Sequence, residues 1–155
     1  MLAAALIVTI RWRGPLQADD FDYAAAFERP TGVERTPTAP NLMALSGRSA
    51  ADVEALLGPP SECEDTLYSR RCQYAQSPVE IVFIDGRADW FTLRGSGEGL
   101  PLAAETLAHF GLPVTEPDHA TEQENLWRDL AGFKEVRMVG DEYGVSYVRI
   151  KALTP

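Results

Sequence analysis

The sequence predicts an α+β fold in which an antiparallel sheet packs against short helices. Residues 79–93 hold two β-prone runs on either side of Asp85-Gly86, and an Asp-Gly pair in that position strongly favours a β-hairpin. Upstream, the stretch from Ala50 to Pro60 is typical of a short helix with a sharp end. We therefore expect a helix, then strands, then a hairpin that presents a sheet.

The folded body is expected to begin near Leu42, and its first clear element is a helix after Ser49. Ser49, with Asp52 three residues further on, predicts a variant of the capping box. The apolar residues that follow at i, i+3 and i+4 share one helical face. Gly58 suits a C-terminal cap, and the two prolines after it forbid continuation of the helix.

Strands are predicted next, around residues 71–75 and then in the hairpin 79–94. The first hairpin strand is apolar on both faces near its centre, with Val79, Ile81 and Phe83 on one and Val82 and Ile84 on the other. This pattern indicates an inner strand with something packed on each side.

The second half of the chain repeats this order of elements. A helix is expected over 102–110, ended by Gly111, and the Gly-rich stretch 95–99 before it is interpreted as a connector. Residues 122–131 suit either a helix or a strand, and Thr121 with Glu124 favours the helix by capping. Residues 133–139 and 145–151 then predict a hairpin whose turn is 140–144.

The two halves resemble each other, which predicts a tandem duplication of a helix–strand–hairpin unit. Three helix-end residues recur at a constant offset of 53 positions: Ala55, Gly58 and Pro60 match Ala108, Gly111 and Pro113. The predicted repeats span residues 45–94 and 100–151, which could share one sheet or pack two sheets side by side.

Residues 45–93 resemble a recurring bacterial module. The matching stretches are Leu45-Ser46-Gly47-Arg48-Ser49, Asp52-Val53, Leu56-Leu57-Gly58-Pro59-Pro60 and the hairpin from Ile81 to Phe91. They look like the small outer-membrane lipoprotein of the β-barrel assembly machinery, whose architecture is shared by the β-lactamase-inhibitor proteins. The resemblance implies a periplasmic, non-enzymatic protein that binds other proteins. This chain departs from the lipoproteins because no cysteine that could be acylated follows its apolar N-terminal run.

The N-terminal part has a different composition from the body. Residues 1–13 are interpreted as an apolar arm or truncated anchor, and residues 14–41, rich in Pro and Thr, as a tether. The apolar run is too short to cross a bilayer alone. It could be a fragment of a signal or anchor, an arm that lies on a partner or membrane, or a first β-strand. Trp12, between two arginines, suits an interface.

Cys63 and Cys72 are candidates for a disulfide. The segment between them could double back as a hairpin and bring the two side chains to bonding distance. Such a bond would imply an oxidising compartment. The alternative is a pair of buried free thiols that pack as small hydrophobic residues.

Charge and composition exclude some functions. The 155-residue chain has a net charge of -9 and scattered basic residues, which argues against nucleic-acid binding. His109 and His119 with the two cysteines match no zinc spacing, so no metal and no cofactor is expected. Asp85 is explained by its turn and Asp89 by its strand, so this pair does not indicate acid–base catalysis. The sequence therefore predicts a protein without enzymatic activity.

The aromatic residues are the better guide to function. Most should lie in the core, and Trp90 and Tyr147 are expected on an exposed sheet face, where aromatic side chains bind proteins well. With Trp12, they form the predicted protein-binding set. The predicted function is a scaffold or interaction module of the bacterial cell envelope, membrane-associated on the periplasmic side, as an accessory subunit of a membrane complex. The alternative is a secreted or periplasmic inhibitor or ligand-binding domain that uses its sheet face.

Overall fold

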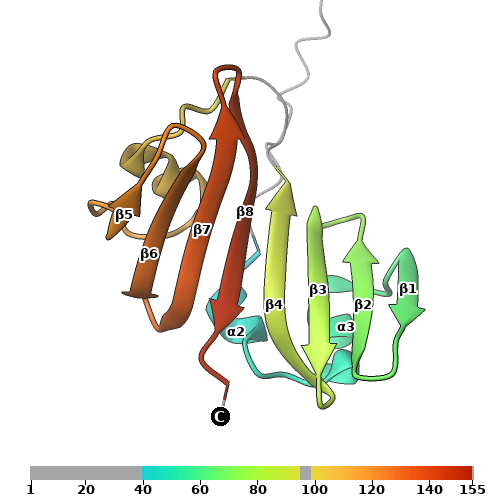
Figure 1. Cartoon of the computed structure of the whole chain (residues 1–155). Helices are drawn as coiled ribbons and strands as arrows, with labels where there is room; N and C mark the ends of the chain where they lie inside the picture. Colours follow the sequence, from blue (N-terminus) through green and yellow to red (C-terminus); the bar gives the residue numbers. More distant parts are fainter. Residues whose placement is uncertain (1–39, 95–98, 155) are drawn as a thin grey trace, which may run out of the picture. The chain divides into compact units, whose positions relative to one another are not determined.

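Eight antiparallel strands form one sheet in the order β1-β2-β3-β4-β8-β7-β6-β5. This computed structural model describes residues 40–94 and 99–154, and Figure 1 shows short helices against one face of the sheet. The predicted arm 1–13 and residues 14–39 of the predicted tether lie outside the described residues, as do residues 95–98 of the Gly-rich connector.

The elements follow the chain as two runs of neighbouring strands. The helices are α2 (Leu42–Leu45), α3 (Ala50–Leu57) and the 3-10 helix η1 (Ala104–Phe110). The first four strands are β1 (Glu62–Asp65), β2 (Ser69–Tyr74), β3 (Val79–Ile84) and β4 (Arg87–Arg94). The other four are β5 (His119–Ala120), β6 (Glu124–Leu130), β7 (Phe133–Asp141) and β8 (Gly144–Ala152). The two runs meet where β4 pairs with β8.

The start and end of α3 are as predicted. The Ser49 hydroxyl accepts a hydrogen bond from the Asp52 amide at 3.2 Å, and the Asp52 carboxylate accepts one from the Ser49 amide at 3.4 Å. This reciprocal pair is a capping box, which satisfies amides that the first helical turn leaves free. Gly58 caps the C-terminus with φ of 83°, a conformation that glycine adopts without a Cβ clash.

The β3–β4 hairpin is also confirmed. Its turn residues Asp85 and Gly86 both have positive φ, 50° and 74°, as a type I′ turn requires. The register between β3 and β4 shifts once: Val82 faces Trp90, whereas the next residue, Phe83, faces Ala88. Asp89 is therefore the extra residue of a β-bulge, and it shares its side of the strand with Trp90.

The second half differs from the prediction in two elements. The helix expected over 102–110 is a 3-10 helix that starts at Ala104, and Gly111 ends it with φ of 72°. The helix that Thr121 and Glu124 favoured is wrong, and the alternative strand is present as β6. The Thr121 hydroxyl accepts hydrogen bonds from the amides of Gln123 and Glu124, which closes a turn between β5 and β6 and leaves no helix to cap.

The core lies between the helices and one face of the sheet. Val53 of α3 and Leu107 of η1 are fully buried there, together with Ile81, Phe91 and Ile150 from the middle strands. The prediction that β3 is covered on both faces is wrong. Val82 is half-buried and Ile84 is 37% exposed, because the described helices all lie on the opposite face.

The antiparallel sheet with short helices is confirmed, although strands dominate it. Strands make up 46% and helices 17% of the structure, so α+β describes it only in part. Among the described helices, none has the length and apolar character that a membrane span requires.

Candidate functional site

One face of the sheet carries no helix among the described residues, and we call it the open face. Its side chains line up in rows across the strands, since residues paired in register point the same way. The row through Thr92 crosses all eight strands of the sheet. It contains Glu62, Gln73, Glu80, Thr92, Arg149, Arg137, Leu126 and His119. The open face therefore combines residues from both halves of the chain.

The middle of the open face, where β4 meets β8, is the candidate site, and we call it the central patch. It consists of Trp90, Thr92 and Arg94 of β4, Tyr147, Arg149 and Lys151 of β8, and the neighbouring Arg71, Glu80 and Val82. A shallow hollow of about 260 Å³ lies among most of these side chains. Three of its seven lining residues are arginines, and Glu80 and Tyr147 also line it.

Trp90 is half-buried and lies close to two basic side chains of β8. The guanidinium carbon of Arg149 lies 4.4 Å from the centre of the Trp90 ring, and the Lys151 ammonium lies 5.6 Å from it. A cation above an aromatic face is attracted to the ring electrons. The Trp90 ring therefore supports the Arg149 guanidinium, while the Arg149 side chain remains exposed to solvent.

A buried ion pair between Asp89 and Lys151 lies at the Trp90 end of the central patch. The Lys151 ammonium and the Thr154 hydroxyl both donate hydrogen bonds to one carboxylate oxygen of Asp89, which is 3% exposed. The β-bulge turns Asp89 to the same side as Lys151 and makes this contact possible. Asp89 is thus buried in an ion pair, and Asp85 lies in its hairpin turn as predicted.

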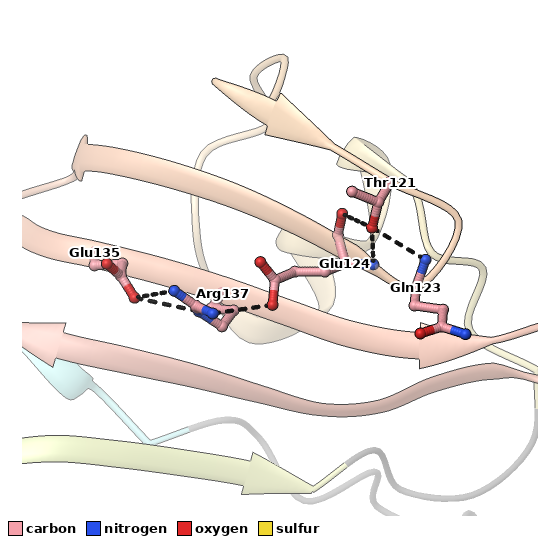
Figure 2. A network of polar contacts seen from close by, with 5 residues as sticks. All are labelled: Thr121, Gln123, Glu124, Glu135 and Arg137. Atoms are coloured by element: carbon pink, nitrogen blue, oxygen red, sulfur yellow. Dashed lines mark hydrogen bonds and ion pairs between the residues drawn. The ribbon is translucent and has the colours of Figure 1, made fainter.

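Glu124 of β6 and Glu135 of β7 share an ion-pair network with Arg137, as Figure 2 shows. The Arg137 guanidinium donates to Glu124 at 3.0 Å and to Glu135 at 3.2 Å. Desolvation acts to lower the pKa of Arg137, but the two carboxylates outweigh it and raise the pKa above its ordinary value. This network of one guanidinium and two carboxylates fully pairs the charge of Arg137 and is itself negative.

The centre of the patch keeps uncompensated positive charge. Arg71 lies 3.7 Å from Glu80, whereas no carboxylate of the described residues comes within 4.0 Å of Arg94 or Arg149. Both arginines are exposed. A chain with a net charge of -9 thus presents, on neighbouring strands of its open face, two guanidinium groups that no carboxylate of residues 40–94 and 99–154 pairs.

The structure brings two of the predicted binding residues together. Trp90 and Tyr147 lie on adjacent strands of the open face, both half-buried, and Trp12 is outside the described residues. Sequence reasoning missed Arg94 and Arg149. The alternation of Trp90, Thr92 and Arg94 along one strand was visible, but the pairing of β4 with β8 was not.

The other candidate residues lie outside the central patch. The sulfurs of Cys63 and Cys72 are 2.02 Å apart in a disulfide that joins β1 to β2. His109 lies in the last turn of η1 and His119 on the edge strand β5. Within residues 40–94 and 99–154, no group of His, Cys, Asp and Glu could hold a metal ion.

A second exposed feature was not predicted. Leu67 and Tyr68, at the tip of the β1–β2 hairpin, are 84% and 80% exposed beside a hollow of about 410 Å³. Two large apolar residues between Thr66 and Ser69 are the sequence pattern that could have indicated this tip.

None of the family models, curated proteins or solved structures compared with the chain matches it. The resemblance of residues 45–93 to the bacterial envelope module therefore stays a prediction.

Proposed function

We propose that the chain is a non-catalytic interaction or scaffold module that binds a partner protein through the open face of its sheet. The observation that carries this proposal is the central patch, where Trp90 lies under Arg149 beside Tyr147. Tryptophan, tyrosine and arginine are the residue types most enriched in the energetic centres of protein interfaces. A shallow surface of this kind suits a macromolecule better than a small substrate, which needs an enclosing cavity.

The proposed setting is the bacterial cell envelope, on the periplasmic side, as an accessory subunit of a membrane complex. The Cys63–Cys72 disulfide supports an oxidising compartment. The resemblance of residues 45–93 points to the same place. A secreted or periplasmic inhibitor or ligand-binding domain is the alternative, which the hollow in the central patch favours.

We also propose that the body arose by tandem duplication, and matching turns support this. In the β1–β2 turn the Thr66 hydroxyl accepts from the Ser69 amide at 3.1 Å, and in the β5–β6 turn Thr121 accepts from Glu124 at 3.0 Å. In both turns the threonine amide also donates 2.8 Å to the carbonyl of the fourth residue. The same local device recurs at the same place in each run of four strands.

The pairing of β4 with β8 supports the duplication independently. The two-residue turns before these strands, Asp85-Gly86 and Glu142-Tyr143, are 57 positions apart (142 minus 85). Thr92 and Arg149 are also 57 positions apart (149 minus 92), and they face each other across the pair. When two repeats are related by a twofold axis, equivalent residues face each other only where that axis passes. The central patch would therefore lie on the twofold axis that relates the two proposed repeats.

Site-specific photo-crosslinking in the cells that make the protein tests the binding function. Thr92, inside the central patch, would be replaced by a photoreactive benzoylphenylalanine in the full chain. Leu56, which is 58% exposed on α3, is the matched control position. We expect a discrete protein adduct from position 92 that is absent from position 56 and is lost with Trp90→Ala. Equal adducts at both positions, or none at position 92, would contradict the proposal.

A further inference from the structure

We infer that the central patch recognises an extended, acidic segment of its partner, with carboxylates at alternate positions. This inference rests on the proposed function and names the chemistry of the partner. It combines the charge of the patch with the spacing of Arg94 and Arg149.

The charge argument depends on which side chains already have partners. Lys151 is bound to Asp89, Arg71 is close to Glu80, and Arg137 is shared by Glu124 and Glu135. Arg94 and Arg149 are the basic residues of the central patch that no described carboxylate neutralises. A guanidinium binds a carboxylate through two parallel hydrogen bonds, so each of these arginines can hold one acidic side chain.

The spacing argument comes from the register of β4 and β8. Arg94 faces Tyr147 and Arg149 faces Thr92, so the two arginines are diagonal neighbours on one side of the sheet. Such neighbours are about 7 Å apart. In an extended chain, side chains at i and i+2 point the same way and are separated by about 6.6 Å. The Cβ atoms of the two arginines are therefore spaced like those of alternate residues in an extended chain, and their long side chains can reach two carboxylates at such positions.

Trp90 contributes to the same surface. Arg149 rests on its ring, which limits the conformations of the guanidinium before the partner arrives. A preorganised arginine loses less entropy when it binds. Aromatic or apolar side chains next to the carboxylates would contact Trp90 and Tyr147.

The surroundings favour an acidic polypeptide over nucleic acid. A polyanion with regular phosphates would also meet Glu80 in the hollow and the carboxylates of β6 and β7, and the whole chain would repel it. A short acidic segment needs favourable charge only at the two arginines.

Peptide binding to the full-length protein tests this inference. The probe is a fluorescein-labelled peptide of alternating Glu and Tyr, followed by anisotropy at low and high salt. We expect saturable binding that weakens with salt. The double variant Arg94→Glu/Arg149→Glu should weaken it by about tenfold or more. Arg128→Glu, an exposed arginine of the open face outside the central patch, is the matched control and should leave the affinity unchanged.

Two further peptides test whether binding requires carboxylates and whether it requires them at alternate positions. A Gln–Tyr peptide should not bind, and a peptide of the same composition with its glutamates placed in adjacent pairs should bind more weakly. Equal binding of all three peptides, or stronger binding of anionic phospholipid vesicles or single-stranded DNA at the same arginines, would overturn the inference. If no peptide binds while position 92 still crosslinks to a protein, the inference fails and the proposed function stands.

Discussion

The Arg149 guanidinium carbon lies 4.4 Å from the centre of the Trp90 ring, although the two residues belong to different halves of the chain. This contact exists because β4 and β8 are the last strands of their runs and pair with each other. The bulge at Asp89 places the extra residue on the side of Trp90 and links the same two strands by an ion pair. The centre of the open face is therefore held by contacts between the halves.

Removal of the guanidinium should weaken this junction slightly. We expect Arg149→Ala to lower the free energy of unfolding by about 0.5–1 kcal/mol, the usual strength of an exposed cation–π contact. Urea denaturation followed by circular dichroism measures it. Arg128→Ala, which removes an arginine of the same face away from Trp90, serves as the control. An equal loss in both variants would show that the contact with Trp90 contributes nothing.

The Asp89–Lys151 pair should matter more. We expect Asp89→Asn to cost about 2 kcal/mol, because it leaves the Lys151 ammonium without its counter-charge. This expected loss is smaller than the loss for a fully buried ion pair, because the Lys151 side chain is 20% exposed to solvent. The double variant Asp89→Asn/Lys151→Met should recover part of the loss in the same urea experiment. A double variant less stable than Asp89→Asn would contradict this explanation.

The disulfide should stabilise the β1–β2 edge of the sheet. Cys63 and Cys72 close a short loop, and chain-entropy estimates for loops of this size give about 2–3 kcal/mol. We expect dithiothreitol to lower the stability of the natural protein by this amount. The Cys63→Ala/Cys72→Ala variant should unfold at the same urea concentration with or without the reductant. Reduction without any loss of stability would rule out this role.

The β6–β7 turn offers a stabilising change. Ala131 has φ of 52° and precedes Gly132 with φ of 84°, so an alanine occupies a left-handed position that asparagine tolerates better. Ala131→Asn should raise the free energy of unfolding by about 0.5–1 kcal/mol. Asp85→Ala, which places alanine in the equivalent position of the β3–β4 turn, should lower it. Thermal denaturation compares the two variants, and opposite signs are required.

The capping box of α3 predicts a pH dependence. Hydrogen bonds from the Ser49 side chain and then from its backbone lower the pKa of Asp52 below its ordinary value. A carboxylate with a lowered folded-state pKa stabilises the protein above its unfolded pKa, and the contribution is lost as the pH falls through the folded value. Natural protein and Asp52→Asn should therefore differ near neutral pH and converge in acid. A difference that grows in acid would have the wrong sign.

Local chemistry accounts for the elements that could be predicted. The Ser49 cap, the Gly58 stop and the Asp85-Gly86 turn each depend on residues a few positions apart, and the cross-strand cysteines lie within one hairpin. Their energies come from backbone geometry and nearby hydrogen bonds, which the order of residues specifies directly.

Long-range packing accounts for the rest. The alternation of residues along β3 separates its two faces but does not specify which face the helices cover. Because Val82 and Ile84 are apolar, the sequence wrongly predicted that both faces of β3 are covered. The pairing of Trp90 with Lys151 joins residues far apart in the chain, and it alone brings Arg94 beside Arg149. The two neighbouring arginines of the open face therefore result from the pairing of β4 with β8. The pattern of residues along one strand could not predict this, because it does not specify which strand lies next to it in the sheet.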